Sequence, residues 1–555
     1  MRSTKSRVAA LVVATALAVA GCSSNKSDDG AKNEVSADGK VVIDTFSPQG
    51  PDDNLSTNPV TKIMSDKFKI EFRWQTTTYD AGPAKEKRQI ALASGDYPDL
   101  FMLIPWVDGI TQADVLKLGT QGVALPIEQL IKDNAPNIQK ALDSNKTYKE
   151  MATAPDGHIY ALPQWSDCFH CNYPDKLWLN SAWLKKLGLQ MPKTTEELRT
   201  VLRAFKTQDP NGNGKADEIP MTTDVQDSSL MGYLMNAFAY NPVGANNGVR
   251  SLLTLDGDKV TTPVNSDAWK EGLKYINSLY KEGLIDQGAF TQNAAALQAQ
   301  GNNPKAVTLG SVPVLWPGIF VQLGSKDGRD KQYDAAPPLT GPSGVSYTGY
   351  NNPTSTGFTF ILTNKASKEA QVAAIKMLDY IYTDEGQRIA NMGPEGVGWT
   401  KPGPTDVALD KSVKAEYKPK PSATTPKNIS WGALAQYNNT LAFRNALAAP
   451  TDIYAEAGLE RRLFEATKLY DGHEDKAKVF PATSVWPDPS LSAELATLQT
   501  NLNSYVQQNQ LAFITGTKNI DTGWDAYVKG LDSTGMKRYL EIQQQAYDKY
   551  KAGTK

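Results

Sequence analysis

The sequence predicts an α/β protein with a parallel sheet, and three patterns near the start of the chain support this class. Strand-like runs occupy 41–46 and 68–74, and a third, more apolar run occupies 99–104. Helical spacing of apolar residues lies between them, at 61–68 and 84–94. Strands that alternate with helices at this spacing indicate a parallel sheet covered by helices.

Later segments predict further helices. Apolar periodicity indicates helices at 176–188, 195–207, 266–282, 368–382 and 523–551. Trp178 and Trp183 share the spacing of the first of these helices, so both are assigned to the core. We detect no internal repeat of the kind that marks a solenoid or propeller.

Residues 1–21 have the pattern of a bacterial lipoprotein signal peptide. Basic residues precede a short apolar run at 8–20, and small residues precede Cys22. The apolar run is too short for a comfortable membrane span. Cys22 is therefore the expected lipidation site, and the polar stretch 22–38 is the expected flexible tether. An ordinary signal peptide with a chance cysteine is the alternative.

Composition indicates a globular protein with room for two large domains. The 555 residues are 40% hydrophobic and 21% charged, with a net charge of −2 that becomes more negative when the basic leader is removed. A protein that binds nucleic acid would favour clustered Lys and Arg on one face, and no long basic run occurs. The composition therefore argues against a nucleic-acid partner.

The segment 209–218 resembles the front of an EF-hand calcium loop. Oxygen donors occur at the expected positions: Asp209, Asn211, Asn213, Lys215 through its carbonyl, Asp217 and, one position later, Glu218. Gly214 allows the sharp turn, but Pro220 replaces the bidentate glutamate of a standard loop. Glu218 must then complete the shell around a structural calcium ion. The alternative is an Asn/Gly-rich turn without metal.

The pair Cys168 and Cys171 admits several interpretations. A redox pair would need a helix that follows a strand, and zinc would need further ligands that His158 and His473 do not provide nearby in sequence. Outside the cytoplasm, a small-loop disulfide or two unpaired thiols are the favoured alternatives.

A family resemblance follows from several segments. Leu-Ala-Ser-Gly-Asp-Tyr-Pro-Asp-Leu-Phe at 92–101, the run 177–198, and the motifs at 513–516, 524–527 and 543–547 resemble family 1 extracellular solute-binding lipoproteins of ABC importers. The calcium-like loop lies where the long, alginate-oligosaccharide-binding members carry calcium. The resemblance implies a two-lobed, periplasmic-binding-protein-like (class II) α/β fold with three inter-lobe crossovers. It also implies a monomer that captures an oligosaccharide and delivers it to the transmembrane subunits of an ABC permease.

Mapping the crossovers onto this sequence places the N-terminal lobe at 39–162 plus 333–393. The C-terminal lobe then comprises 163–332 plus 394–555. Pro-rich joints near these boundaries are plausible places for the chain to leave one lobe for the other.

Aromatic residues in predicted loops are candidates for sugar contact. An aromatic ring can stack on the flat C–H face of a sugar while polar groups bind its hydroxyls. The candidates are Trp106, Asp108, Gln164, Trp165, Trp316, Trp399 and Trp431. Packing in the core or at the lobe interface is the alternative for each.

Three other functions compete with import. A secreted glycoside hydrolase would need two suitably spaced carboxylates, and the many acidic residues make chance proximity common. No nucleophile elbow, zinc-protease motif or phosphate loop occurs, so we expect no enzyme activity. A sugar-sensing or adhesion lipoprotein and a binder of peptide-like solutes remain as alternatives on the same fold.

Overall fold

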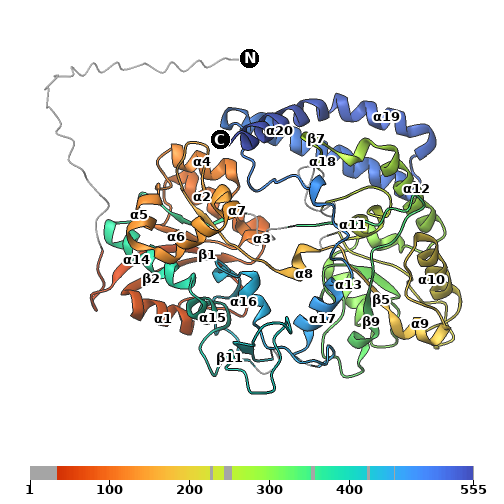
Figure 1. Ribbon diagram of the computed structural model, residues 1–555, viewed down its shortest axis with the longest axis horizontal. Coiled ribbons are helices and arrows are strands. Elements are labelled where there is room, and N and C mark those ends of the chain that lie inside the picture. The colour runs from red at the N-terminus through yellow and green to blue at the C-terminus, as the bar shows by residue number, and fades with distance from the viewer. Residues whose placement is uncertain are drawn as a thin grey trace, which may run out of the picture.

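The computed structural model describes residues 34–225, 229–242, 253–351, 357–421, 425–455 and 457–553, arranged as two lobes side by side (Figure 1). The predicted leader and Cys22 lie outside the described residues. None of the described helices combines the length and apolar character needed to cross a bilayer.

The first lobe is built on a five-stranded sheet. Its order is β2 (Ile70–Thr78), β1 (Val41–Gln49), β3 (Leu100–Met102), β10 (Phe358–Leu362) and β4 (Leu162–Pro163). β1 pairs in parallel with both β2 and β3, which confirms the predicted parallel layer, whereas β10 pairs antiparallel with β3 and β4.

Helices cover this sheet and enclose its core. Asn58 caps α1 through the Val60 N–H, and Lys69 ends the helix in a left-handed conformation before β2 begins. The helices are α1 (Pro59–Phe68), α2 (Ala81–Ser94), α3 (Pro105–Asp108), α4 (Gln112–Thr120), α5 (Glu128–Asn134), α6 (Pro136–Ser144), α7 (Lys146–Ala152), α14 (Lys368–Ile381) and α15 (Asp384–Met392).

The second lobe has a smaller sheet and more helix. Its sheet order is β8 (Ser311–Pro313), β5 (Leu177–Asn180) and β9 (Tyr333–Ala336), and a hairpin pairs β6 (Thr254–Asp256) with β7 (Lys259–Thr261). The helices are α9 (Ser181–Leu187), α10 (Thr195–Thr207), α11 (Leu230–Met235), α12 (Asp267–Lys281), α13 (Ala294–Gly301), α17 (Leu459–Thr467), α18 (Ser492–Thr515), α19 (Ile520–Ser533) and α20 (Met536–Lys551).

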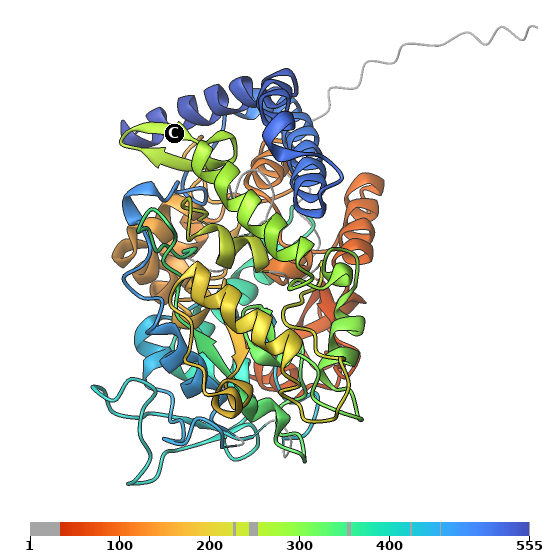
Figure 2. The same ribbon diagram turned by 90° about the vertical axis from the view of Figure 1, so that its right-hand side faces the viewer.

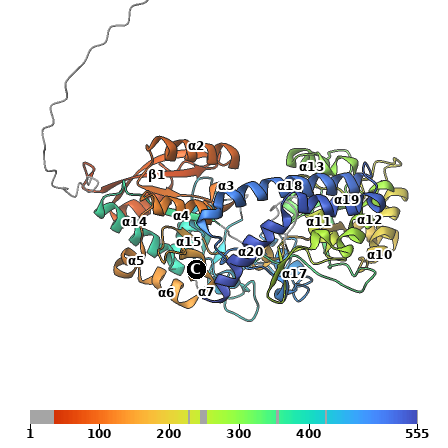
Figure 3. The same cartoon turned by 90° about the horizontal axis from the view of Figure 1, so that it is seen from above.

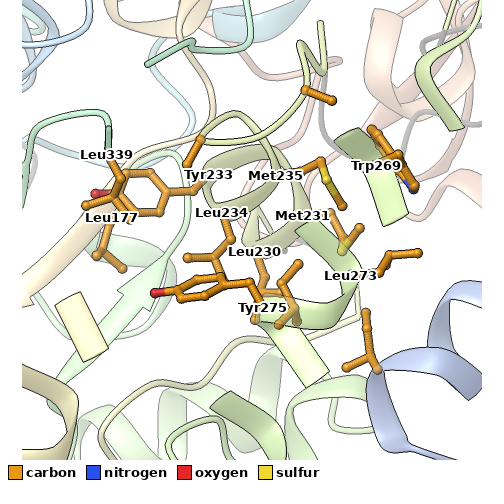
Figure 4. Close-up of a cluster of buried hydrophobic side chains, with 14 of the residues drawn as sticks. Leu177, Leu230, Met231, Tyr233, Leu234, Met235, Trp269, Leu273, Tyr275 and Leu339 are labelled. Atoms are coloured by element: carbon orange, nitrogen blue, oxygen red, sulfur yellow. The ribbon is translucent and has the colours of Figure 1, made fainter. Parts of the chain in front are cut away.

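The core of the second lobe forms where α11 and α12 pack together. Met231, Leu234 and Met235 from α11 lie near Trp269 and Leu273 from α12 in a buried cluster (Figure 4). Figure 2, which looks onto the outer side of this lobe, shows α10 and α12 in front of the molecule.

The chain crosses between the lobes three times. β4 leads through α8 (Phe169–Asn172) to β5, and β9 leads back to β10. The last crossing follows Tyr437, which packs in the first core, and passes α16 (Leu441–Asn445) before α17. Beside it, β11 (Trp399–Thr400) pairs with β12 (Lys418–Pro419).

Two predicted lobe boundaries need correction. Tyr333–Ala336 was assigned to the first lobe, but it pairs with β5 in the second sheet. Trp431 and Tyr437 were assigned to the second lobe, but they pack in the core of the first. The Pro-rich joint at Gly393 ends α15 within the first lobe, so it does not mark a crossing.

Two helix predictions also differ from the structure. The predicted helix 176–188 is a strand, β5, followed by the shorter α9. The predicted helix 523–551 is two helices, because Gly535 adopts φ 103° and begins α20 in a new direction. The predicted bounds of α10 agree with the structure, where Thr194 and Glu197 form a capping box.

Candidate functional site

A cavity of about 730 Å³ lies between the lobes and is lined by both. The first lobe contributes residues that follow β3, residues of α7, and residues at the ends of β4 and β10. They are Pro105, Trp106, Gly109, Ile110, Thr111, Gln112, Thr147, Met151, Pro163, Gly357 and Phe358. The facing wall consists of Pro242, Leu253, Tyr350, Asn351, the segment 479–484 and Tyr550. The lining mixes aromatic and apolar surface with uncharged hydrogen-bonding groups, as ligand sites commonly do.

The strand order of the first lobe explains why the cavity forms there. β1 lies between β2 and β3, and all three run in the same direction, so their carboxyl ends meet at one edge of the sheet. The chain passes from β1 through α1 to β2 on one side, and then through α2 to β3 on the other side of β1. A crevice forms at the carboxyl ends of the strands where the strand order reverses in this way. Pro105 and Trp106 begin α3 directly beyond β3, and therefore enter this crevice.

Trp106 is the exposed aromatic residue of the cavity. All eleven tryptophans lie in the described part of the chain, and Trp106 alone is exposed, at 54% of its surface. Its Nε1 donates a hydrogen bond to the Tyr79 hydroxyl at 3.2 Å. A ligand in the cavity could therefore contact the Trp106 ring, and its role in binding stays a prediction.

Asp108, also a predicted contact, has a different place. Its carboxylate accepts a hydrogen bond from Arg88 Nε at 2.9 Å, and both side chains are buried beneath α3. Burial raises the pKa of Asp108, and the Arg88 charge opposes that rise. Asp108 does not line the cavity. It fixes α3, and hence Trp106, instead of meeting a ligand directly.

The facing wall comes from parts of the chain that the sequence analysis did not single out. Gln112 Nε2 donates to the Thr483 carbonyl at 2.7 Å, and the Tyr550 hydroxyl donates to Glu150 Oε2 at 3.2 Å. Both bonds join the lobes, and Figure 3 shows α20 near α7 from above. No local motif marks the segment 479–484, because its place depends on packing far from it in sequence.

The remaining predicted contacts do not line this cavity. Trp165 lies at a second, smaller cavity of about 360 Å³ in the first lobe, and packs edge-on against Tyr148. The side chain of Gln164 is buried and donates to the Ala433 carbonyl at 2.7 Å. Trp316 lies beside a short turn of the second lobe.

Trp399 and Trp431 are structural residues. Trp399 Nε1 donates to the Gly393 carbonyl at 3.0 Å, and its ring packs in a small cluster with Tyr417. Trp431 Nε1 donates to Thr61 Oγ1 at 2.9 Å, within the first core. Both rings are buried and satisfy their indole N–H groups inside the protein, and the structure places neither of them at this cavity.

Cys168 and Cys171 form a disulfide that closes the turn of α8 on the first crossover. With His170 they are the one group of described His, Cys, Asp or Glu side chains close enough to share a metal ion, but disulfide sulfurs are not thiolate ligands. The buried Lys176 ammonium donates to the carbonyls of His170 and Tyr173, which braces the same turn.

The loop 209–218 turns its side-chain oxygens toward its own backbone. Asp209 accepts from the N–H groups of Gly212, Asn213 and Gly214 at 2.9–3.1 Å. Asn211 and Asn213 accept from N–H groups two residues later in the same way. Gly212 and Gly214 both have φ 74°, which lets the chain wind around a centre.

Acidic groups of this loop are incompletely neutralised. The amide groups of Asn211 and Asn213 donate to Asp217, and these bonds lower its pKa. Glu218 Oε1 is buried and has no hydrogen-bond partner among the described residues. Burial raises the pKa of Glu218, with a further contribution from the charges of Asp209 and Asp217. An orphaned carboxylate oxygen beside hard oxygen donors fits a calcium ion.

Comparison with known proteins agrees with this architecture. Residues 55–388 match the family model for bacterial extracellular solute-binding protein. The fructooligosaccharide ABC transporter substrate-binding protein FusA of Streptococcus pneumoniae is 30% identical over 524 residues, which cover 91% of this chain and 89% of FusA.

Solved structures extend the similarity. FusA in complex with kestose matches with a TM-score of 0.71 at 26% identity, covering 92% of this chain and 100% of that one. An EF-hand mutant of FusA in complex with fructo-nystose matches equally well. An extracellular solute-binding protein from Bifidobacterium longum subsp. infantis matches with a TM-score of 0.77 at 26% identity, covering 94% and 100%.

Proposed function

Because the chain belongs to the bacterial extracellular solute-binding proteins and has their two-lobed fold, we propose that it captures an oligosaccharide between its lobes and presents it to an ABC permease. The observation that carries this proposal is the cavity between the lobes, where exposed Trp106 faces uncharged polar groups from both sides. A sugar is bound by an aromatic ring that stacks on its C–H face and by polar groups that form hydrogen bonds with its hydroxyls. FusA, a relative of similar length, binds fructooligosaccharides, which supports the same class of ligand.

Binding without cleavage is part of the proposal. Glycoside hydrolysis uses a pair of carboxylates on either side of the scissile bond. Within the described residues, the cavity is lined by Thr, Ser, Asn, Gln and Tyr as its polar side chains. These groups can hold a sugar, but they do not supply a general acid at neutral pH.

Titration calorimetry with kestose, nystose and maltooligosaccharides tests the proposal. We expect saturable binding of one of these sugars, and no smaller products by chromatography after prolonged incubation. Trp106→Ala should weaken binding about tenfold or more, because stacking surface is lost. Trp316→Ala is the matched control, since Trp316 is outside the cavity, and should leave the dissociation constant unchanged. Cleavage of the sugar, or equal effects of the two variants, would contradict the proposal.

Calcium would bind the loop 209–218 as a structural ion. Side-chain oxygens of Asp209, Asn211, Asn213, Asp217 and Glu218 and the Lys215 carbonyl would hold it, and its charge would offset the clustered carboxylates. None of these residues lines the cavity. The ion would therefore stabilise the second lobe without contacting the sugar.

The proposed location is the outer face of the cytoplasmic membrane. Membership of an extracellular family supports a position outside the cytoplasm. Lipidation at Cys22 would hold the protein near its permease, with 22–38 as the tether. Radiolabelled palmitate incorporation that is abolished by Cys22→Ser would support the anchor, and label retained by the variant would refute it.

A further inference from the structure

Tyr79 forms an exposed aromatic surface with Trp106 just outside the cavity. Tyr79 follows β2 directly, and Trp106 follows β3, so the parallel sheet brings both to the same edge. The Trp106 indole N–H donates to the Tyr79 hydroxyl at 3.2 Å. Tyr79 is 40% exposed and is not part of the cavity lining. The two rings therefore extend the aromatic wall of the cavity outward, past its rim.

The protein holds this pair in place from beneath. Trp106 lies on α3, whose first residue is Pro105, and the proline ring fixes the backbone φ there. Asp108, the last residue of α3, is anchored to Arg88 of α2 by a buried ion pair at 2.9 Å. An ion pair buried this deeply tolerates little displacement, since separation would leave a charge unpaired in the interior. The aromatic surface is thus oriented before any ligand arrives.

We propose that Tyr79 and Trp106 form an outer subsite for one sugar unit, continuous with the cavity that holds the inner units of the same oligosaccharide. This inference rests on the proposed function and adds the ligand's length. Trp106 belongs to both parts, because it lines the cavity and bonds to Tyr79 outside it. A ligand confined to the cavity does not reach Tyr79, whereas a longer one does. Tyr79 is thus a residue that sets preference for length.

The test compares the di-, tri- and tetrasaccharide sucrose, kestose and nystose by titration calorimetry. Tyr79→Ala should raise the dissociation constant of the longest bound sugar by about three- to tenfold, because one aromatic contact is lost. The dissociation constant of the shortest bound sugar should not change. Tyr79→Phe should retain most of the affinity, because the ring remains. The matched control is Tyr97→Ala, since Tyr97 precedes β3 at the opposite edge of the sheet and bonds to Asn364 at 3.0 Å. It should leave all three sugars unaffected.

The outcomes separate this inference from the function on which it rests. If the unaltered protein binds neither these three sugars nor maltooligosaccharides, both the proposed function and the subsite are contradicted. If Tyr79→Ala lowers the affinity for all bound sugars equally, or for none of them, the subsite is refuted and the proposed function stands. A melting temperature for Tyr79→Ala close to that of the unaltered protein shows that the loss is local.

Discussion

Replacing Glu218 by Gln should change stability in opposite directions with and without calcium. Without the ion, Glu218 Oε1 is buried without a hydrogen-bond partner among the described residues, near Asp209 and Asp217. Gln has nearly the same shape but no charge, so the variant should be as stable as the unaltered protein in a chelator, or slightly more stable. With calcium, the variant lacks one anionic oxygen of the proposed shell, and should be less stable.

The expected size of the change in stability follows from the linkage between calcium binding and folding. A calcium concentration one hundred times the dissociation constant stabilises the folded protein by about 2.7 kcal/mol. If Glu218→Gln weakens calcium binding one hundredfold, the same concentration contributes only about 0.4 kcal/mol. The unfolding entropy is about 2.1 cal/mol/K per residue, so for a lobe of about 300 residues a change of about 1 kcal/mol shifts the melting temperature by roughly 1.6 °C. The calcium-dependent rise in melting temperature should therefore shrink by about 4 °C.

Scanning calorimetry in a chelator, in calcium and in magnesium measures these shifts. Glu271→Gln is the matched control, because Glu271 is an exposed residue of α12 paired with Lys274 at 3.0 Å. It should respond to calcium as the unaltered protein does. The reasoning is refuted if calcium leaves the melting temperature of the unaltered protein unchanged, or raises that of Glu218→Gln equally.

Three further predictions concern buried groups of the described chain. Asp108→Ala should lower the free energy of unfolding by about 3–5 kcal/mol in urea titrations, because it leaves the buried Arg88 charge unpaired; a loss below about 1 kcal/mol would contradict this. Burial raises the pKa of Asp175 to about 7, so its contribution to stability should be fully present below about pH 4 and lost as pH rises to about 7. Urea unfolding measured from about pH 4 to about pH 7 should show a loss of unfolding free energy of at most about 4 kcal/mol. Asp175→Asn should abolish this loss. The same dependence of unfolding free energy on pH in both proteins would contradict the role of Asp175. Serine at both Cys168 and Cys171 should cost about 2 kcal/mol under non-reducing conditions, and a dithiol should destabilise only the unaltered protein.

Local signals predicted the elements that depend on local chemistry. The bounds of α10 follow from its apolar spacing and from Thr194 and Glu197, which cap it reciprocally. Leu177–Asn180 was misread as helix because a short buried strand and a buried helix share the same apolar run. Its partners lie more than a hundred residues later in sequence, so periodicity alone could not reveal the pairing. Gly535 was a usable signal for the helix break, because a glycine in left-handed conformation commonly ends a helix.

The same distinction applies to the candidate site. Trp106 could be found from sequence, because it follows a buried strand directly and such positions meet at the sheet edge. Trp399 and Trp431 looked equivalent beside Gly and polar residues, yet each packs its ring internally and satisfies its indole N–H with a protein acceptor. Whether a loop tryptophan is exposed depends on which distant segment covers it, and that information is absent from its neighbours in sequence.

The separate positions of the calcium loop and the cavity have a thermodynamic consequence. An ion can change sugar affinity only if it favours one arrangement of the lobes over another, and the sugar then changes ion affinity by the same factor. The loop directly follows α10 in the second lobe, and none of its residues lines the cavity. Its backbone continues into Ile219 and Met221, which bridge to Leu309 and Ile285 within the same lobe. Calcium held there would stabilise contacts within one lobe. If those contacts are the same in every arrangement of the two lobes, the free energy of calcium binding cancels from the sugar equilibrium, and we expect calcium to leave sugar affinity unchanged.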